Sequence, residues 1–247
     1  GLHDRDLRPL LVNLTDETDP EASLRMLRQY SVDGVIIASS TLPATFAKAF
    51  RDSGVPTVHS FGRQTAAPAV DVLGIDNIAA GKLAARTLIE RGYTEIGFLG
   101  GPADATSTVD RETGFLSEVA QHNSVAATTS FATAYSFEAG RAEMTRLLAS
   151  KPAQAYFCGD DVLSIGAMSA LQSAGLKVPG DVGIIGLNDM EMAGWENINL
   201  TTIHNPISEI IAASIARVAE LVAEPTLEPQ ARLFDGSVVE RGTLRAL

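Results

Sequence analysis

The sequence predicts an α/β protein made of two doubly wound, parallel-sheet lobes. Strand-like and helix-like patterns alternate along all 247 residues, which is typical of parallel sheets with right-handed crossovers. The strand-like segments are short apolar runs bounded by turn residues, as expected for strands that are buried on both faces. They are too numerous for one sheet, and Gly100, Gly101 and Pro102 break the pattern near the middle of the chain.

Each element follows from the same two signals, taken in chain order. In the first half, apolar runs predict strands at residues 10–14, 33–38, 55–59, 70–75 and 95–99. Apolar residues at helical spacing predict helices at residues 20–30, 42–52 and 79–90. In the second half, the strands are expected at residues 127–131, 153–158, 182–187, 200–203, 231–234 and 238–239. The helices are expected at residues 109–121, 136–148, 161–174 and 207–223.

The charge balance argues against nucleic-acid binding by this chain alone. Its formal net charge is −11, and such a surface repels a phosphate backbone. The single cysteine, Cys158, lies in an apolar run and is expected to be a buried core thiol. The sequence has no apolar span of 18 residues, and its first residues lack the apolar core of a signal peptide.

Catalytic patterns are poor. The four histidines are scattered without metal-ligand spacing. No nucleophile elbow, Walker loop or complete dinucleotide fingerprint occurs. The adjacent acids Asp160 and Asp161 would point in different directions from a helix start, so they form a poor acid/base pair. We therefore expect no enzymatic activity, no cofactor and no metal site.

Polar residues gather where the apolar runs stop. Asn188 and Asp189 follow the run at residues 182–187, and Asp76, Asp160 and Asn205 close other runs. In open α/β sheets, ligands bind beyond the carboxyl ends of the strands. If two lobes face each other by these ends, the polar groups line a shared cleft that suits a polyhydroxylated or heterocyclic ligand.

Each of these residues also has a simpler structural explanation. Asp76, Asp160 and Asp161 stand at helix starts, where a carboxylate caps the helix and complements its dipole. By default Arg111 would be a solvated surface arginine, and Tyr135 would be a packed core ring. Residue types and spacing leave these alternatives open.

A set of segments spread over nearly the whole chain forms one pattern: Val32-Asp-Gly-Val-Ile-Ile37, Gly74-Ile-Asp-Asn-Ile-Ala-Ala-Gly81, Arg91-Gly-Tyr-Thr-Glu-Ile-Gly-Phe-Leu-Gly-Gly101, Arg111-Glu-Thr-Gly-Phe115, Cys158-Gly-Asp-Asp-Val-Leu-Ser-Ile-Gly166, Ala170-Leu-Gln-Ser-Ala-Gly175, residues 178–189, Leu200-Thr-Thr-Ile203 with Asn205-Pro206, and Glu240-Arg-Gly-Thr243. Together these segments resemble the effector-binding domain of the LacI/GalR family of bacterial transcription regulators. The resemblance implies a periplasmic-binding-protein-like fold with the ligand between two lobes. We expect residues 1–101 with residues 205–232 to form the N-terminal lobe, and residues 102–204 with residues 233–247 to form the C-terminal lobe.

Carried over by position, the resemblance implies effector contacts at Arg111, Asp76, Asn188, Tyr135, Asp160 and Asn205. Arg111 is the main expected contact, and a ligand-facing arginine predicts that its replacement by Ala leaves thermal unfolding nearly unchanged. Three positions depart from the family pattern: Asp160 stands where Asn is common, Asn188 where Asp is common, and Asn205 where Gln is usual. The resemblance implies that the effector is a sugar, a polyol or a similar small molecule, and these departures predict that it differs from the family's common sugars.

The resemblance also implies a biological role. By comparison with the family pattern, we expect that this sequence lacks the DNA-binding headpiece and the first strand and helix of the N-terminal lobe. We expect the ligand-sensing domain of a cytoplasmic regulator that acts as a homodimer, reaches DNA only through a headpiece and does not contact a membrane. The alternatives are a periplasmic solute-binding component of a sugar transporter, which shares the fold, and an α/β enzyme that uses the cleft.

Overall fold

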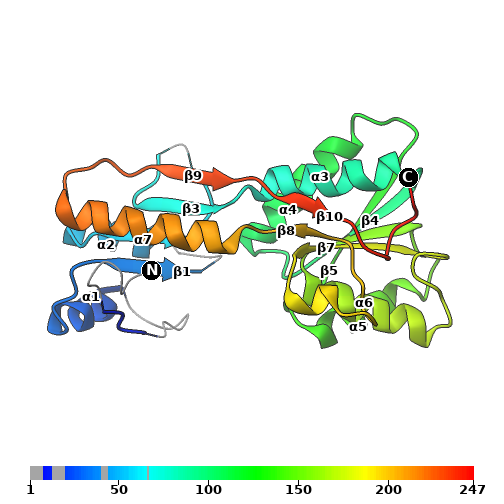
Figure 1. The fold of residues 1–247 in the computed structure, drawn as a ribbon, viewed down its shortest axis with the longest axis horizontal. Helices are drawn as coiled ribbons and strands as arrows, with labels where there is room; N and C mark the ends of the chain where they lie inside the picture. The colour runs from blue at the N-terminus through cyan, green and yellow to red at the C-terminus, as the bar shows by residue number, and fades with distance from the viewer. Residues whose placement is uncertain (1–7, 13–19, 40–43, 66) are drawn as a thin grey trace. The chain divides into compact units, whose positions relative to one another are not determined.

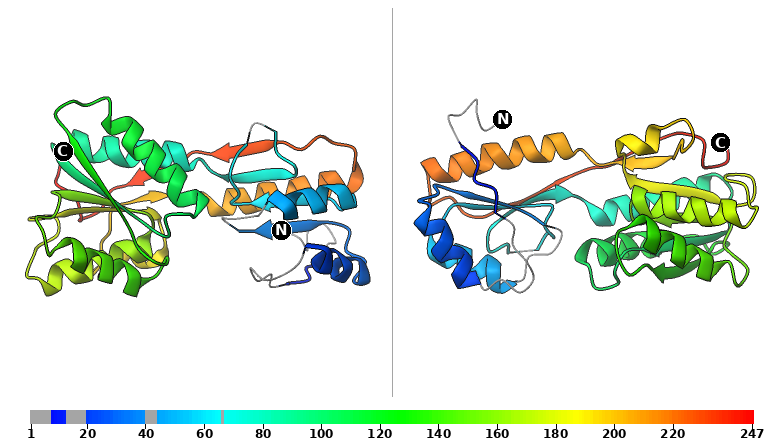
Figure 2. Two further views of the ribbon diagram at one scale, coloured as in Figure 1. Left: turned by 180° about the vertical axis from the view of Figure 1, so that it is seen from behind. Right: turned by 90° about the horizontal axis from the view of Figure 1, so that it is seen from below.

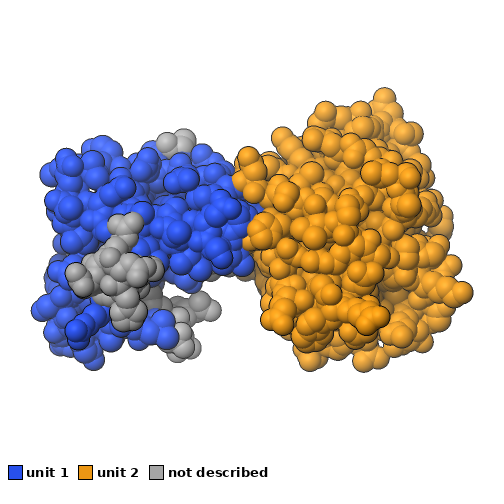
Figure 3. Space-filling view, viewed as in Figure 1, with its two compact units in different colours: residues 1–75, 206–234 blue, residues 76–205, 235–247 orange. Residues whose placement is uncertain are grey.

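A computed structural model describes residues 8–12, 20–39, 44–65 and 67–247. The chain forms two compact units, coloured separately in Figure 3. Unit 1 contains residues 1–75 and 206–234, and unit 2 contains residues 76–205 and 235–247. The two α/β units with parallel sheets confirm the predicted fold class.

Unit 1 is a four-stranded parallel sheet with helices on both faces. Its strand order is β1-β2-β3-β9, where the strands are β1 (Val35–Ala38), β2 (Thr57–Ser60), β3 (Asp71–Ile75) and β9 (Ala231–Phe234). Helix α7 (Ile207–Ala223) covers one face, and α1 (Pro20–Gln29) and α2 (Ala44–Ser53) cover the other (Figure 2). Val58, Leu73 and Ile210 form the core under α7, while Leu24 and Phe50 belong to the core under α1 and α2.

Unit 2 is a six-stranded sheet of order β10-β8-β7-β6-β4-β5, in which only the edge strand β10 is antiparallel to its neighbour. The strands are β4 (Glu95–Gly100), β5 (Ala126–Phe131), β6 (Ala155–Cys158), β7 (Gly183–Asn188), β8 (Thr202–His204) and β10 (Ser237–Val239). Helices α3 (Asn77–Glu90) and α4 (Thr106–Val119) pack together on one face, and α5 (Phe137–Leu147) and α6 (Asp161–Ser173) pack together on the other (Figure 1).

Alternation along the central strands supplies both cores of unit 2, because successive side chains point to opposite faces of a sheet. Phe98 and Phe157 meet Phe115 of α4, with ring centroids 5.5–6.1 Å apart. Tyr156 and Cys158 belong to the core on the α5 and α6 side. The predicted buried thiol is confirmed, since Cys158 is fully buried and burial raises its pKa to about 12.

Two glycines bring α3 and α4 unusually close. A methyl group on Gly81 would overlap the backbone oxygen of Arg111, and one on Gly114 would overlap the backbone oxygen of Ile78. Larger residues at these positions would push the two helix backbones apart. This close approach places the beginning of α3 beside the middle of α4.

The structure differs from the sequence-based expectations at several places. Helix α4 begins at Thr106 rather than near residue 109, and a 3-10 helix, η2 (Glu191–Gly194), was not predicted. Of the strand expected at residues 10–14, Leu10, Leu11 and Val12 lie outside any strand, and the other two residues lie outside the described residues.

A further difference concerns the lobe boundary. The division falls between residues 75 and 76 rather than after residue 101, and the return crossings fall after residues 205 and 234. The turn at Gly100, Gly101 and Pro102 ends β4 but does not separate two units, because β4 is hydrogen-bonded between β5 and β6. A turn signal marks the end of a strand without showing which sheet the strand joins.

Replacing Gly114 with Ala should destabilise the protein by about 1–3 kcal/mol, because the added methyl group overlaps backbone on α3. The direction of the change in unfolding free energy is informative, because replacing a glycine with alanine inside a helix otherwise raises stability by about 1 kcal/mol. Urea unfolding measures the change. Gly180→Ala is the control, because a methyl group at this exposed turn meets its nearest atom, the Lys177 side chain, at 3.4 Å. A Gly114→Ala protein as stable as the parent would contradict the packing argument.

Candidate functional site

The carboxyl edge of the unit 2 sheet, meaning the ends of β4, β6, β7 and β8, carries a row of polar groups. These four strands run parallel to one another, so their carboxyl ends meet at one edge. Asp160 lies just beyond β6, Asn188 ends β7 and Asn205 follows β8. Adjacent strands lie about 4.8 Å apart, so side chains from successive strand ends can contact one small molecule.

Arg111 of α4 is buried at this edge. Its residue exposure is only 8%, its Nε donates to Asn77 Oδ1 at 2.8 Å, and one terminal nitrogen donates to the Gly159 carbonyl oxygen at 2.5 Å. Burial lowers the pKa of Arg111, while Tyr135 and Asp160 act in the opposite direction, and a guanidinium keeps its charge in proteins. The alternative of a solvated surface arginine is therefore wrong.

Tyr135 joins the Arg111 side of the edge. Its hydroxyl lies 2.7 Å from Thr108 Oγ1 and 3.4 Å from Ser107 Oγ, both on α4. Its ring lies against Gly101, where a methyl group would come within 2.5 Å of ring atoms. Tyr135 is half-buried, so the ring is packed at the edge of the sheet rather than enclosed in the core.

The two adjacent aspartates have different roles. Asp160 caps α6, because its Oδ1 accepts the Leu163 backbone N–H at 2.7 Å. Burial raises the pKa of Asp160 although the Leu163 N–H and Arg111 favour its ionised form. Asp161 does not cap the helix. Its carboxylate accepts the Met190 backbone N–H at 2.7 Å and the Thr202 hydroxyl at 2.5 Å.

Asn188 and Asn205 form a second polar group on the neighbouring strands. Asn205 Nδ2 donates to Asn188 Oδ1 at 3.2 Å. Asn205 is 7% exposed, and its Oδ1 is a buried atom with no hydrogen-bond partner among the described residues. A buried acceptor without a donor costs roughly 1–3 kcal/mol, and a ligand hydroxyl or N–H could satisfy it.

The backbone at the end of β7 is unusual. Asn188 has φ 116° and Asp189 has φ 55°, a region that residues other than glycine seldom adopt. Such conformations persist where surrounding contacts enforce them, and they cluster at functional sites. Asp189 accepts hydrogen bonds from Arg241 at 2.7 Å and from His204 at 3.1 Å. Burial opposes ionisation of Asp189, but these two partners hold its pKa below the ordinary value.

Asp76 caps α3 by accepting the Ala79 backbone N–H at 2.8 Å, and the next residue, Asn77, contacts Arg111. All six predicted residues thus belong to unit 2. Arg111, Tyr135 and Asp160 lie together, Asn188 contacts Asn205, and Asp76 is linked to Arg111 only through Asn77. That these residues bind a ligand, and that they do so between two lobes, stays a prediction.

Sequence reasoning missed Thr108 and Thr202, and it mistook the role of Asp161. Asn77 was expected, beside Asp76, among the polar groups at a strand end, but not as the partner of Arg111. The partners of Asp161 lie 29 and 41 residues further along the chain, and no local pattern reports them.

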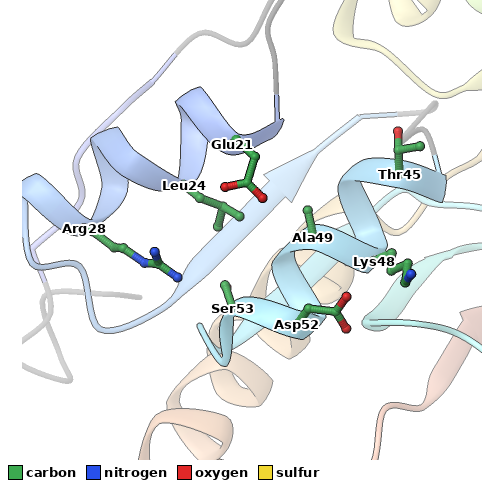
Figure 4. A pocket seen from close by; sticks show the side chains of 8 residues that line it. All are labelled: Glu21, Leu24, Arg28, Thr45, Lys48, Ala49, Asp52 and Ser53. Carbon is green, nitrogen blue, oxygen red and sulfur yellow. The ribbon is translucent and has the colours of Figure 1, made fainter.

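A pocket of about 320 Å³ lies in unit 1, between α1 and α2 (Figure 4). Leu24 and Ala49 line it together with charged side chains of both signs, including Arg28, Lys48 and Asp52. It contains none of the six predicted site residues.

Asp161 should make stability depend on pH in a defined window. Burial raises its pKa from 3.8 to about 6, so between these values the folded protein binds more protons at Asp161 than the unfolded chain. The free energy of unfolding therefore falls as pH rises through this window, by up to about 3 kcal/mol. Asp161→Asn should lack this component. Urea unfolding of both proteins from pH 4 to pH 7 measures it, and parallel pH profiles would contradict the assignment.

Comparison with known proteins places this chain in a family. The profile of the periplasmic binding protein-like domain matches residues 85–244. The chain is 30% identical over 230 residues to the HTH-type transcriptional repressor PurR of Klebsiella pneumoniae, covering 90% of this chain and 67% of the relative. PurR of Escherichia coli is also 30% identical, with 89% of this chain and 65% of the relative covered. The chain therefore spans about two thirds of the length of these relatives.

Solved structures agree in fold. A LacI family transcriptional regulator from Enterococcus faecalis with bound ribose has a TM-score of 0.85 at 23% identity, covering 100% of this chain and 90% of that chain. The transcriptional regulator CelR in complex with cellobiose has a TM-score of 0.81 at 25% identity, covering 91% and 69%. A putative LacI regulator from Bacillus cereus subsp. cytotoxis has a TM-score of 0.90 at 20% identity, covering 99% and 88%. The chain belongs to the LacI/GalR family, as an effector-binding domain with the periplasmic-binding-protein-like fold.

Proposed function

We propose that this domain senses a small, sugar-like effector at the carboxyl edge of unit 2 and reports it to the DNA-binding part of a transcription regulator. The observation that carries the proposal is the buried, unpartnered Asn205 Oδ1 in the same row as the buried guanidinium of Arg111. Buried polar groups are normally paired. An unpaired acceptor at the ligand-binding edge of an α/β sheet is accounted for by a ligand donor.

The chemistry of the row suits a polyol or sugar. Arg111 supplies donors, Asp160 supplies acceptors, and the amides of Asn188 and Asn205 supply both. A hydroxyl group donates one hydrogen bond and accepts others, so several hydroxyls can be matched at once. The neutral amide of Asn188 favours a ligand group that both donates and accepts, whereas a carboxylate there would only accept.

The relatives support the regulator over the transporter component. The PurR relatives are named as transcriptional repressors, and two structural neighbours are regulators with ribose or cellobiose bound. In the described residues no helix has the length and apolarity needed to cross a bilayer. We propose a cytoplasmic, non-catalytic homodimer in which the effector shifts the population of conformations that the DNA-binding part experiences. The net charge of −11 supports a DNA contact made outside this chain, because an acidic surface repels a phosphate backbone.

A thermal-shift screen with D-ribose, cellobiose, other sugars, polyols and nucleosides tests the ligand class, because a ligand that binds only the folded state raises the unfolding temperature. Calorimetric titration then gives the affinity of the selected compound. Arg111→Lys keeps the charge but loses the directed contacts to Asn77 and Gly159, so the affinity should fall about 100-fold or more.

The matched control is Arg91→Lys. Arg91 is also buried in unit 2 and donates to the Thr87 carbonyl oxygen at 2.9 Å, but it lies at the opposite end of α3 from Asp76. Because both arginines are buried, both variants should lower the unfolding temperature. For Arg111, this prediction corrects the sequence-based expectation that its replacement leaves thermal unfolding nearly unchanged. Only Arg111→Lys should weaken binding. No stabilisation of the parent by any compound in the panel, or equal binding by parent and Arg111→Lys, would overturn the proposal.

A further inference from the structure

Asp161 has a buried carboxylate that the ligand-binding row does not use. Its residue exposure is 0%, and its two oxygens accept hydrogen bonds from two separate segments, the Met190 N–H and the Thr202 hydroxyl. Met190 follows Asn188 and Asp189 directly, and Thr202 begins β8, the strand that leads to Asn205. One side chain at the start of α6 thus ties together the two segments that carry the amide pair.

We propose that Asp161 is a positioning residue for the effector site: its carboxylate fixes the end of β7 and the start of β8, so that Asn188 and Asn205 present their amides in one orientation. The inference rests on the proposed function and adds to it a residue that makes no ligand contact itself. Asp161 acts through the backbone of Met190 and the hydroxyl of Thr202.

The strained turn gives the first argument. Asn188 and Asp189 both have positive φ angles, and non-glycine residues hold such angles only where other contacts impose them. The Asp161 hydrogen bond to Met190 fixes the peptide after this pair. The contacts of Asp189 with Arg241 and His204 fix its second residue. The turn is thereby held from two sides.

The space around the carboxylate gives the second argument. A methyl group on Gly186 would overlap Asp161 Oδ1 and approach Ser164 Oγ within 2.9 Å. The missing side chain on β7 therefore leaves the room that Asp161 needs to reach over the strand. A carboxylate is also the group that can accept from both a backbone N–H and a hydroxyl at once.

The burial of this charge gives the third argument. An ionised carboxylate taken out of water is costly unless it is well hydrogen-bonded, and Asp160 and Asp189 lie close enough to oppose its ionisation. An apolar residue would fill the space without that cost, but it would leave the Met190 N–H without its acceptor. The fixed orientation of the turn at Asn188 and Asp189 offsets the free-energy cost of burying the carboxylate.

The test compares Asp161→Ala, Asp161→Asn and Thr202→Val with the parent. In Asp161→Asn the amide oxygen can accept from Met190, and the amide N–H can donate to the Thr202 oxygen. Asp71→Ala is the control for losing a buried carboxylate, because Asp71 begins β3 in unit 1 and pairs with Arg217 at 2.7 Å. Thr202→Val removes one of the two anchors at nearly constant volume and remains informative if Asp161→Ala does not fold.

Two readouts need no ligand. Amide hydrogen exchange reports the Met190 N–H directly, and acrylamide quenching reports Trp195, the only tryptophan of the sequence, which follows η2 and is 53% exposed. In Asp161→Ala the Met190 exchange should accelerate about 10-fold or more, and the quenching of Trp195 should change. Asp161→Asn should keep both the Met190 exchange rate and the Trp195 quenching close to the parent values. Thr202→Val should change them less than Asp161→Ala does, and Asp71→Ala should change neither readout.

The third readout is affinity for D-ribose, cellobiose or any other panel compound that binds the parent. It should fall about 10-fold or more in Asp161→Ala and stay within about threefold of the parent in Asp161→Asn. Unchanged exchange, quenching and affinity in both Asp161→Ala and Thr202→Val would overturn the positioning role, as would a changed turn with unchanged affinity. If no compound binds the parent, the proposed function fails, and the first two readouts still decide whether Asp161 holds the turn.

Discussion

The buried guanidinium of Arg111 organises the candidate site. It joins three parts of unit 2 that are distant in sequence: α4, which carries it, the start of α3 through Asn77, and the end of β6 through the Gly159 carbonyl oxygen. A buried cation needs such partners, because its desolvation is costly without them. Its position in turn depends on Gly81 and Gly114, which allow the backbones of α3 and α4 to approach. The packing of α3 against α4 therefore also determines the geometry of the candidate site in unit 2.

The ionised groups around Arg111 have different structural roles. Asp160 caps α6 and lies near the guanidinium, while the adjacent Asp161 turns away to the loop after β7 and to β8. Asp189, which directly follows Asn188, accepts hydrogen bonds from Arg241 and His204. Asn188 and Asn205 are neutral amides among these charges. Asp161 and Asp189 maintain the framework. We propose that the two amides, Arg111 and Asp160 contact a neutral, hydroxyl-rich ligand.

The family assignment and the site chemistry are separate conclusions. Similarity to the PurR repressors and to the LacI regulators identifies the domain and its fold. It does not name the effector, because the same fold holds ribose in one neighbour and cellobiose in another. Specificity is set by individual side chains at the strand ends. The amides at residues 188 and 205 and the acid at residue 160, which depart from the common family pattern, are the places where this protein's effector preference would be decided.

The sequence by itself determined the alternation of strands and helices, because apolar periodicity and turn residues are local signals. Helix α7 and β5 were placed to within one residue, and the buried Cys158 was predicted from its apolar neighbours. Tertiary structure alone decided which sheet β4 joins, that Arg111 is buried, and that Asp161 accepts hydrogen bonds from Met190 and Thr202 rather than capping its own helix. Each of these depends on partners tens of residues away in the chain, and hydrogen bonds between such segments leave no local trace in the sequence.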